Sequence, residues 1–264
     1  MKLIANHKYK NFTIHHYDEI LSTNQSAYNL AENRQIFDRE LILANLQTKG
    51  RGRLDRAWSS PLGNLYFSLI LQPKINLNQI SKISFVVSCA IQKTFEKIFN
   101  QFEIQAEIKN KWPNDLLINN QKVAGILIEG KNSENLNEFL VVGVGINVIS
   151  NPTDTIFPAT NLASFSINIS TLDLLKLFLD EFEVLYENWL KFGFKNIREL
   201  WLKNAFNLDQ NIIIKPNNIS ISGVFKNIDD GLATSFAPAH IFYLTRERIH
   251  ITKRARSILC YFLL

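Results

Sequence analysis

The sequence predicts an α+β fold, in which a mixed, largely antiparallel sheet has flanking helices, with a small β-rich domain after it. Short apolar segments separated by polar turns recur between residues 40 and 148, which is typical of strands. Two longer segments, 78–99 and 170–189, carry apolar residues three and four positions apart, which predicts amphipathic helices. From about Leu208 only short strands recur, so we place a domain boundary between residues 207 and 208.

The composition indicates a globular protein with a mild excess of positive charge. The chain has 264 residues, 46% of them hydrophobic, and a formal net charge of +5. This is ample apolar material for a core and suits acidic partners such as nucleotides, but it is too little charge to require DNA. Cys89 and Cys260 lie far apart in sequence, as in proteins of reducing compartments. Because no signal peptide or membrane-spanning run is apparent, we expect a cytoplasmic protein without a membrane partner.

Near the N-terminus, residues 13–21 predict a strand that leads into a helix. His15 and His16 would then lie on opposite faces of the strand and could not share a metal ion, which favours ordinary strand residues. Ser22 and Gln25 match a capping box. A helix start explains them fully, although hydroxyls and free N–H groups at a helix N-terminus can also bind a polar ligand.

The stretch 47–68 joins two apolar strands, 40–47 and 64–72, through a basic loop. Like charges this close repel unless an anion lies among them, and N–H groups beside glycines can line an anion site. This predicts a mobile loop that orders on a phosphate-bearing ligand, with Trp58 as a flat surface for a ring. A solvated loop that touches nucleic acid is the alternative. The loop contains Lys49, Gly50, Arg51, Gly52, Arg53 and Arg56.

A second polar motif, KWPND, follows the strand predicted at 106–111. Pro113 favours an extended Trp112, and Asn114 with Asp115 predicts a turn. The motif is either a plain turn or a ligand site. As a site, Lys111 would meet phosphate as a point charge, and the oxygens of Asn114 and Asp115 would suit magnesium.

Strands are predicted at 116–118, 123–129 and 139–148, and Gly125, Gly143 and Gly145 lie inside them. Glycine weakens a strand interior, so each needs a reason. Close approach of a flat ligand to the sheet is one, and β-bulges are the other. Further along, a short helix at 197–204 precedes about five short strands that predict an antiparallel barrel. Residues 231–240 are poor strand material, and the tail 253–264 fits no predicted element.

The basic loop with RAWSSPLGNLYFS, then KWPNDLLINNQKVAGILIE at 111–129, then GVGINV at 143–148, resembles biotin protein ligases, in the right order from about Ser22 to Val148. The resemblance implies a class II synthetase-like catalytic domain at 1–207 and an SH3-like barrel at 208–264. It implies the form that lacks an N-terminal DNA-binding domain, because the catalytic pattern begins by about residue 13. We therefore expect no sequence-specific DNA binding; a homodimer is compatible with the resemblance.

The resemblance implies a two-step reaction. The biotin carboxylate attacks the α-phosphate of ATP, pyrophosphate leaves and biotinyl-5'-AMP forms; a lysine of the biotin carboxyl carrier protein then attacks this anhydride and releases AMP. Both first-step substrates are anions, so positive charge and positioning would supply the rate, together with Mg2+. The sequence has neither a P-loop nor a G-x-S-x-G elbow.

Site residues follow from the same resemblance. The catalytic residues would be Lys122, Arg53 and Lys111, and Asp115 would bind magnesium. Biotin would contact Ser22, Thr23, Asn24, Gln47, Gly50, Arg51, Gly52, Arg53, Lys122 and Gly125. ATP would contact Arg51, Arg53, Trp58, Lys111, Asn114, Asp115, Lys122 and Asn147.

Two other functions remain open from sequence. One is a lipoate-type ligase, which would use the same chemistry on a longer apolar acid. The other is a non-enzymatic nucleic-acid-binding protein that uses the basic loop and the barrel. The modest net charge and the acidic Asp55 and Asp115 among the basic residues are unfavourable for binding along a phosphate backbone.

Overall fold

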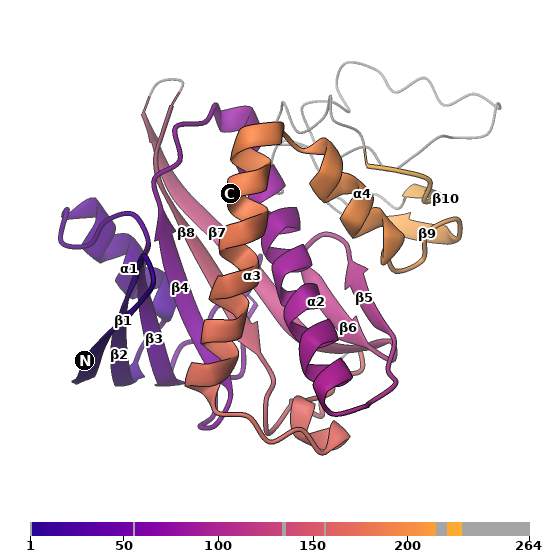
Figure 1. Ribbon diagram of the computed structural model, residues 1–264, viewed down its shortest axis with the longest axis horizontal. Coiled ribbons are helices and arrows are strands. Elements are labelled where there is room, and N and C mark those ends of the chain that lie inside the picture. The colour runs from indigo at the N-terminus through magenta and orange to yellow at the C-terminus, as the bar shows by residue number, and fades with distance from the viewer. Residues whose placement is uncertain (1, 55, 134–135, 156, 215–220, 229–264) are drawn as a thin grey trace.

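The computed structural model describes residues 2–54, 56–133, 136–155, 157–214 and 221–228. Its centre is an eight-stranded sheet in the order β1-β2-β3-β4-β8-β7-β6-β5 (Figure 1). The strands β2 and β3 pair in parallel, and the other described neighbours pair antiparallel. The α+β prediction is thus confirmed. The strands are β1 (Leu3–Tyr9), β2 (Phe12–Ile20), β3 (Glu40–Gln47), β4 (Leu65–Leu71), β5 (Ile108–Lys111), β6 (Asp115–Ile118), β7 (Gln121–Ser133) and β8 (Leu136–Ile146).

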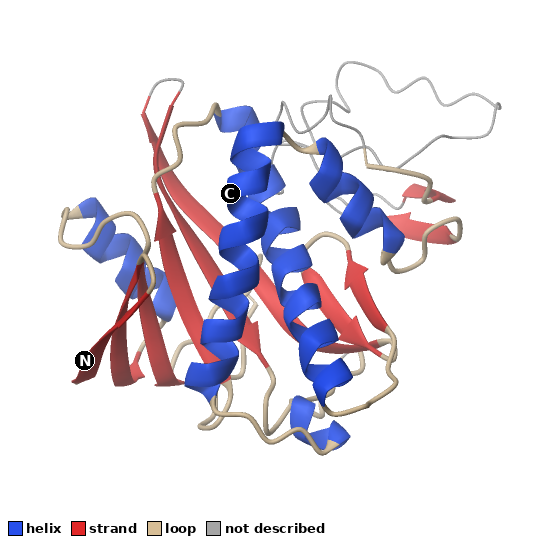
Figure 2. Ribbon diagram, viewed as in Figure 1, coloured by secondary structure: helices blue, strands red, loops and turns tan. Residues whose placement is uncertain are grey.

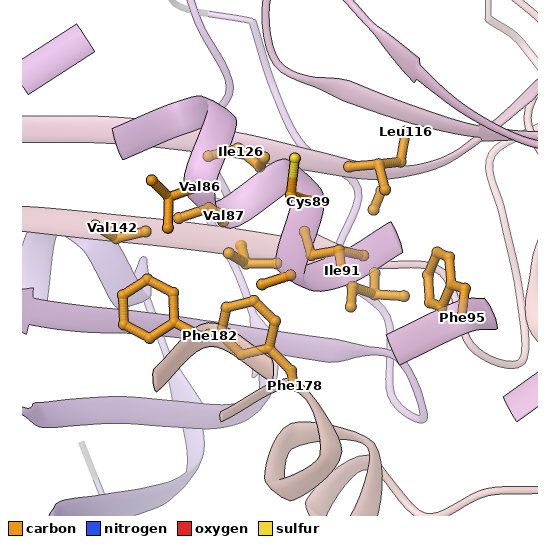
Figure 3. Packing of buried hydrophobic residues seen from close by; sticks show 14 of the residues in the cluster. Val86, Val87, Cys89, Ile91, Phe95, Leu116, Ile126, Val142, Phe178 and Phe182 are labelled. Atoms are coloured by element: carbon orange, nitrogen blue, oxygen red, sulfur yellow. The ribbon is translucent and has the colours of Figure 1, made fainter. Parts of the chain in front are cut away.

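Helices cover both faces of this sheet. The long helices α2 (Ile83–Gln101) and α3 (Thr171–Phe192) lie side by side across one face, and α1 (Thr23–Glu32) packs on the other (Figures 1 and 2). Successive side chains of a strand point to opposite faces of the sheet, so one strand packs against both helix layers. Leu41 and Leu43 of β3 face α2 and α3, whereas Ile42 and Ala44 face α1. The larger cluster includes Phe178 of α3 against residues of α2 (Figure 3).

The helix boundaries follow local chemistry. Ser170 caps α3 by accepting a hydrogen bond from Asp173 N at 3.1 Å, and Gly193 ends it with φ +78°. The predicted single helix over 78–99 is wrong in its first turn. A 3-10 helix, Leu77–Lys82, precedes α2, and the N–H of Ile83 bonds to the carbonyl of Ile80 three residues before it.

The N-terminal strand β1 is an element that sequence analysis did not predict. It comes before β2 in the chain, pairs with β2 in the antiparallel direction and is stabilised by that pairing. The two adjacent histidines of β2 separate as expected: His15 lies 2.6 Å from Glu40 Oε2, whereas His16 contacts Asn45 Oδ1 at 2.8 Å.

After the sheet, α4 (Lys195–Lys203) leads to a small two-stranded sheet of β9 (Asn211–Ile214) and β10 (Ile221–Val224). These two strands fall where the predicted barrel begins. Residues 229–264 lie outside the described chain, so the barrel and the boundary at 207/208 stay predictions. In the residues that the structure describes, no helix is both long and apolar enough to cross a membrane.

Candidate active site

The predicted site residues lie on the α1 face of β4, β8, β7 and β6. The helix α1 begins there, and Ser22 accepts a long hydrogen bond, 3.5 Å, from Gln25 N. Gln47, at the end of β3, turns its Oε1 toward α1 and accepts from Thr23 N at 2.7 Å and from Thr23 Oγ1 at 3.1 Å. Its Nε2 donates to Ser60 Oγ at 2.8 Å. The start of α1 is thus tied to both ends of the basic loop.

A buried hydroxyl that sequence analysis missed completes a polar cluster, which consists of Thr23, Asn24, Gln47 and Ser68. Ser68 Oγ lies 2.8 Å from Thr23 Oγ1 and 2.6 Å from Asn24 Oδ1. Ser68 belongs to β4, in which all seven residues are buried. A lone hydroxyl inside an apolar strand was the sequence signal that could have identified it, because a buried polar group needs a partner.

The basic loop has a defined backbone. Trp58 N donates to Gly50 O at 2.9 Å, and Gly52 N donates to Arg56 O at 2.7 Å, so the chain turns back on itself. A Cβ at the buried Gly50 would collide with Ser60 Oγ and the carbonyl oxygen of Trp58, so that position requires glycine. Gly52 contributes its main chain to this turn.

The side chain of Arg51 extends from the basic loop and contacts two other elements. Its Nη1 donates to Gln25 Oε1 of α1 at 2.8 Å, and its Nη2 forms an ion pair with Glu129 of β7. The Glu129 carboxylate also accepts from Asn24 Nδ2 at 2.9 Å. A protein carboxylate therefore supplies one of the negative charges that the loop was expected to draw from a ligand.

Protein side chains approach the strand glycines closely, at positions where close approach of a flat ligand was predicted. A Cβ at Gly125 would lie 2.8 Å from the Trp58 ring, and one at Gly145 would lie 2.5 Å from Trp58 Nε1. A Cβ at Gly143 would overlap Asn24 Oδ1. β7 and β8 pair regularly from Ala124 to Lys131, so no bulge lies at these glycines in that pairing. On its other side β7 has a register shift against β6 between Lys122 and Ala124, next to Gly125, as the alternative of bulges predicted. In the described chain Trp58 Nε1 is buried and makes no hydrogen bond, so packing holds the indole.

The three predicted catalytic cations share one carboxylate. Lys122 Nζ lies 2.7 Å from Asp115 Oδ1. Burial lowers the pKa of Lys111, an effect that Asp115 opposes and Lys122 reinforces. Burial also lowers the pKa of Arg53, and Asp115 again opposes the change while Arg56 reinforces it. Several positive side chains therefore lie near Asp115, and burial makes the charged forms of Lys111 and Arg53 less favourable than they are in water.

The segment after β8 runs beside both lysines. Lys122 N donates to Pro158 O at 2.7 Å, and Thr160 N donates to Lys122 O at 2.9 Å. The buried Asn147 fixes the same segment through Nδ2, which donates to Thr160 O at 3.0 Å. Lys111 Nζ lies 3.2 Å from the centroid of the Phe157 ring, a cation–π contact that sequence analysis did not predict.

A buried polar network holds the strand that carries Lys111. Asn110 is fully buried, and its side chain contacts Ser88 Oγ at 2.6 Å and Gln92 Oε1 at 2.5 Å, both on α2. Its N–H donates to Asn204 O and its carbonyl accepts from Phe206 N, each at 2.8 Å. Asn110 was missed because its partners are far away in sequence.

The KWPND turn places Asn114 and Asp115 differently from each other. Asn114 Nδ2 donates to Ile126 O at 2.6 Å, which ties the turn to β7, and the Trp112–Pro113 peptide bond is cis. Asp115 Oδ1 is engaged by Lys122. In the described part of the chain no three His, Cys, Asp or Glu side chains gather to hold a metal ion.

The predicted residues therefore form two groups that meet at Trp58. The hydrogen-bonded cluster at the start of α1 is the first group, and the cations around Asp115 are the second. Lys122 Nζ is 5.1 Å from the centroid of the Trp58 ring, and the same ring packs against Gly125 and Gly145. The first group offers hydrogen-bonding side chains, and the second offers positive charge.

Known proteins are similar to this chain in sequence and in fold. The biotin/lipoate A/B protein ligase family matches residues 18–147. A biotin–acetyl-CoA-carboxylase ligase of Paracoccus denitrificans is 31% identical over 79% of this chain and 88% of its own length. The bifunctional ligase/repressor BirA of Bacillus subtilis is 34% identical over 81% of this chain, and the match spans 66% of that relative's length.

A solved structure of biotin protein ligase from Aquifex aeolicus, in complex with biotin and ATP, superimposes with a TM-score of 0.69 at 27% identity. The match covers 82% of this chain and 88% of that one. The family match at residues 18–147 includes the basic loop, the KWPND turn and the strands that carry the glycines. By sequence and by fold, this chain belongs to the biotin/lipoate A/B protein ligase family.

Proposed function

We propose that this protein is an ATP-dependent biotin–protein ligase, which converts biotin to biotinyl-5'-AMP and transfers it to a lysine of a biotin carboxyl carrier protein. One observation carries the proposal: Lys122, Lys111 and Arg53 all interact with the charge of Asp115, Lys122 lies near Trp58, and a cluster of hydrogen-bonded polar side chains lies at the start of α1 on the same face of the sheet. A site for a polar ring and a site for a phosphate therefore adjoin.

The polar cluster at the start of α1 favours biotin over lipoate. The ureido ring of biotin carries N–H donors and a carbonyl acceptor, whereas the dithiolane ring of lipoate carries neither. Thr23, Asn24 and Ser68 present hydroxyl and amide groups that are already linked by hydrogen bonds. Their oxygens keep lone pairs that these bonds do not use. An apolar ring would leave that remaining capacity unmatched, whereas a ring with N–H donors can use it, so this polar cluster favours a polar ring.

The cation cluster supports the adenylation step. The attacking carboxylate and the α-phosphate are both negative, so their approach requires positive charge that is already in position. Lys122 and Lys111 would supply it, and their partial burial strengthens each interaction with a phosphate relative to water. Arg53 and Trp58 would cover the adenylate and exclude water, which would otherwise hydrolyse the anhydride.

We propose that magnesium enters with ATP rather than as a resident ion. Asp115 offers one carboxylate, which suits an ion that keeps several waters and binds substrate phosphates. Its Oδ1 already pairs with Lys122, so Asp115 would meet the ion as part of that pair. Asp115→Asn should then raise the magnesium concentration required for adenylate formation.

The acceptor lysine, the oligomeric state and DNA binding complete the proposal. The second step needs only a neutral lysine amine that reaches the anhydride beside Lys122.

We further propose that formation of a homodimer does not depend on DNA. Arg51 and Lys122 both pair with carboxylates, which makes this surface a poor track for nucleic acid. Sedimentation and gel-shift experiments at physiological salt test these two expectations.

The decisive experiment incubates the protein with ATP, magnesium and either biotin or lipoate, and measures acyl-adenylate by mass spectrometry. A carrier domain is then added, and its mass is measured. Biotinyl-5'-AMP followed by a singly biotinylated carrier is expected. Lipoyl-adenylate as the main product would favour the lipoate alternative, and no adenylate with either acid would contradict the proposal.

A further inference from the structure

We propose that Glu129 is a positioning residue for the biotin side of the site, because its two carboxylate oxygens hold Asn24 and Arg51 together. The inference rests on the proposed function and adds a residue to it. Glu129 Oε2 accepts from Asn24 Nδ2 at 2.9 Å, and Oε1 pairs with Arg51 Nη2. One side chain of β7 thus connects the start of α1 with the basic loop.

Glu129 fixes which way the Asn24 amide faces. The two ends of an asparagine amide have nearly the same shape, so the hydrogen-bond partners decide its orientation. Glu129 and the carbonyl of Leu127 accept from Nδ2, at 2.9 and 3.3 Å. The oxygen Oδ1 is therefore turned toward Ser68, 2.6 Å away. Without the Glu129 carboxylate, Asn24 Nδ2 loses the stronger of the two groups that accept its hydrogen bonds. The orientation of the amide, and with it the direction in which Oδ1 points, is then no longer fixed.

Glu129 also sets the position of Trp58 through Arg51. Arg51 pairs across the loop with Ala57, the residue before Trp58. Holding Arg51 on β7 therefore fixes the turn that carries the indole. That indole lies against Gly125, which belongs to the same strand as Glu129 and the same face of it. The carboxylate is only 26% exposed, so solvent screens these contacts less than those of a surface pair.

Two substitutions separate the roles. Glu129→Gln keeps an oxygen that can accept from Asn24 but removes the charge that binds Arg51, and Glu129→Ala removes both contacts. The matched control is Glu138→Gln, on the neighbouring strand β8, where Glu138 pairs with Lys131 at 4.0 Å and is 42% exposed. Both glutamates lose the same charge, but only one touches the site.

The first measurement is the KM for biotin and for ATP in adenylate formation. We expect Glu129→Gln to raise the KM for biotin about tenfold, the usual effect of losing a hydrogen bond to a charged group. Glu129→Ala should raise it further. The KM for ATP should rise less, because Glu129 holds only Arg51 and, through it, Trp58 among the predicted ATP contacts, and Glu138→Gln should stay within about twofold of wild type for both substrates. Equal increases for both substrates would contradict the inference, because they indicate general damage rather than a positioning role on the biotin side.

The second measurement needs no catalysis. Trypsin cleaves after Arg51, Arg53 and Arg56 when the loop opens, so cleavage within 51–56 without ligands reports how firmly Glu129 holds it. Glu129→Gln should be cleaved several-fold faster than wild type and Glu138→Gln, and the effect should vanish in an Arg51→Gln background if Arg51 transmits it. Unchanged cleavage overturns the inference even if the enzyme is active. Faster cleavage in a protein that makes no adenylate would contradict the proposed function instead.

Discussion

The ammonium group of Lys122 lies 2.7 Å from Asp115 Oδ1, across the pairing of β6 and β7. Asp115 is 17% exposed, so its charge is strongly felt by neighbouring groups. Burial lowers the pKa of Lys111 and of Arg53, and Asp115 opposes both changes. One carboxylate thus partly offsets the effect of burial on the pKa of both groups.

Lys122→Met should abolish most adenylate formation. The change keeps much of the side-chain length, removes the charge and leaves Asp115 without its nearest cation. Loss of a charge contact made in the transition state typically lowers the rate about a hundredfold to a thousandfold. The measurement is pre-steady-state formation of biotinyl-5'-AMP. Lys109→Met, which removes a lysine that pairs with Glu107 at 3.3 Å outside the site, should react at the wild-type rate. Normal adenylate formation by Lys122→Met would show that Lys122 has another role.

Arg53→Gly should loosen retention of the adenylate more than its formation. Arg53 lies on the loop, so its loss should release biotinyl-5'-AMP into solution, where it labels lysines of bystander proteins. Free adenylate and biotinylation of added albumin are the measurements. Arg56→Gly makes the same change on an exposed residue of the same loop and should release little. Retention equal to wild type in Arg53→Gly would contradict the assigned role.

Lys111→Met should lower activity without lowering stability. Because burial holds the pKa of Lys111 below its ordinary 10.5, the folded protein binds this proton less tightly than the unfolded chain. The cost of a charged Lys111 is fully present below the lowered pKa and disappears as pH rises toward 10.5. Denaturant unfolding of wild type should therefore gain stability across that alkaline window, and the gain should shrink in Lys111→Met. An unfolding free energy at pH 7 well below that of wild type would contradict this expectation.

Gly145→Ala should displace Trp58 and weaken biotin binding. The added Cβ would lie 2.5 Å from Nε1 of the indole, closer than real side chains approach, so the ring must move. We expect a shift in tryptophan fluorescence and a higher KM for biotin. The stability cost of Gly145→Ala should be measured in the wild-type background and again in a Trp58→Ala background. The cost should largely vanish in the second, because the indole that the Cβ would meet is gone. The same cost in both backgrounds would place the strain elsewhere.

Asn110→Ala should destabilise the fold and impair Lys111 together. The change leaves Ser88 and Gln92 without their buried partner, which costs about 1–3 kcal/mol for each group left unsatisfied. Denaturant unfolding measures the stability, and adenylate formation measures the effect on Lys111. Thr94→Ala, which removes a buried hydroxyl that donates to Ala90 O of the same helix at 2.8 Å, is the control and should leave the rate unchanged. If Thr94→Ala also forms adenylate slowly, the loss of activity in Asn110→Ala comes from general disturbance of α2 and not from Asn110 itself.

Local patterns predicted the elements around the site, and long-range contacts explain what was missed. The caps at Ser22 and Ser170 and the strands on either side of the basic loop follow from residues a few positions apart. In contrast, Glu129 meets Arg51 across 78 positions and Asn24 across 105. Sequence placed Trp58 beside a ligand, but it could not show that the indole lies on Gly145, because that contact depends on how β8 pairs with β4 and β7.

The outer edge of β5 has a consequence for how the sheet can grow. Asn110 pairs in parallel with Ala205, and both of its main-chain polar groups are engaged by residues 204 and 206. An exposed edge strand normally offers such groups to any extended peptide. At this position the chain has already used them, so an incoming strand cannot add there and shift the register of Lys111, the next residue.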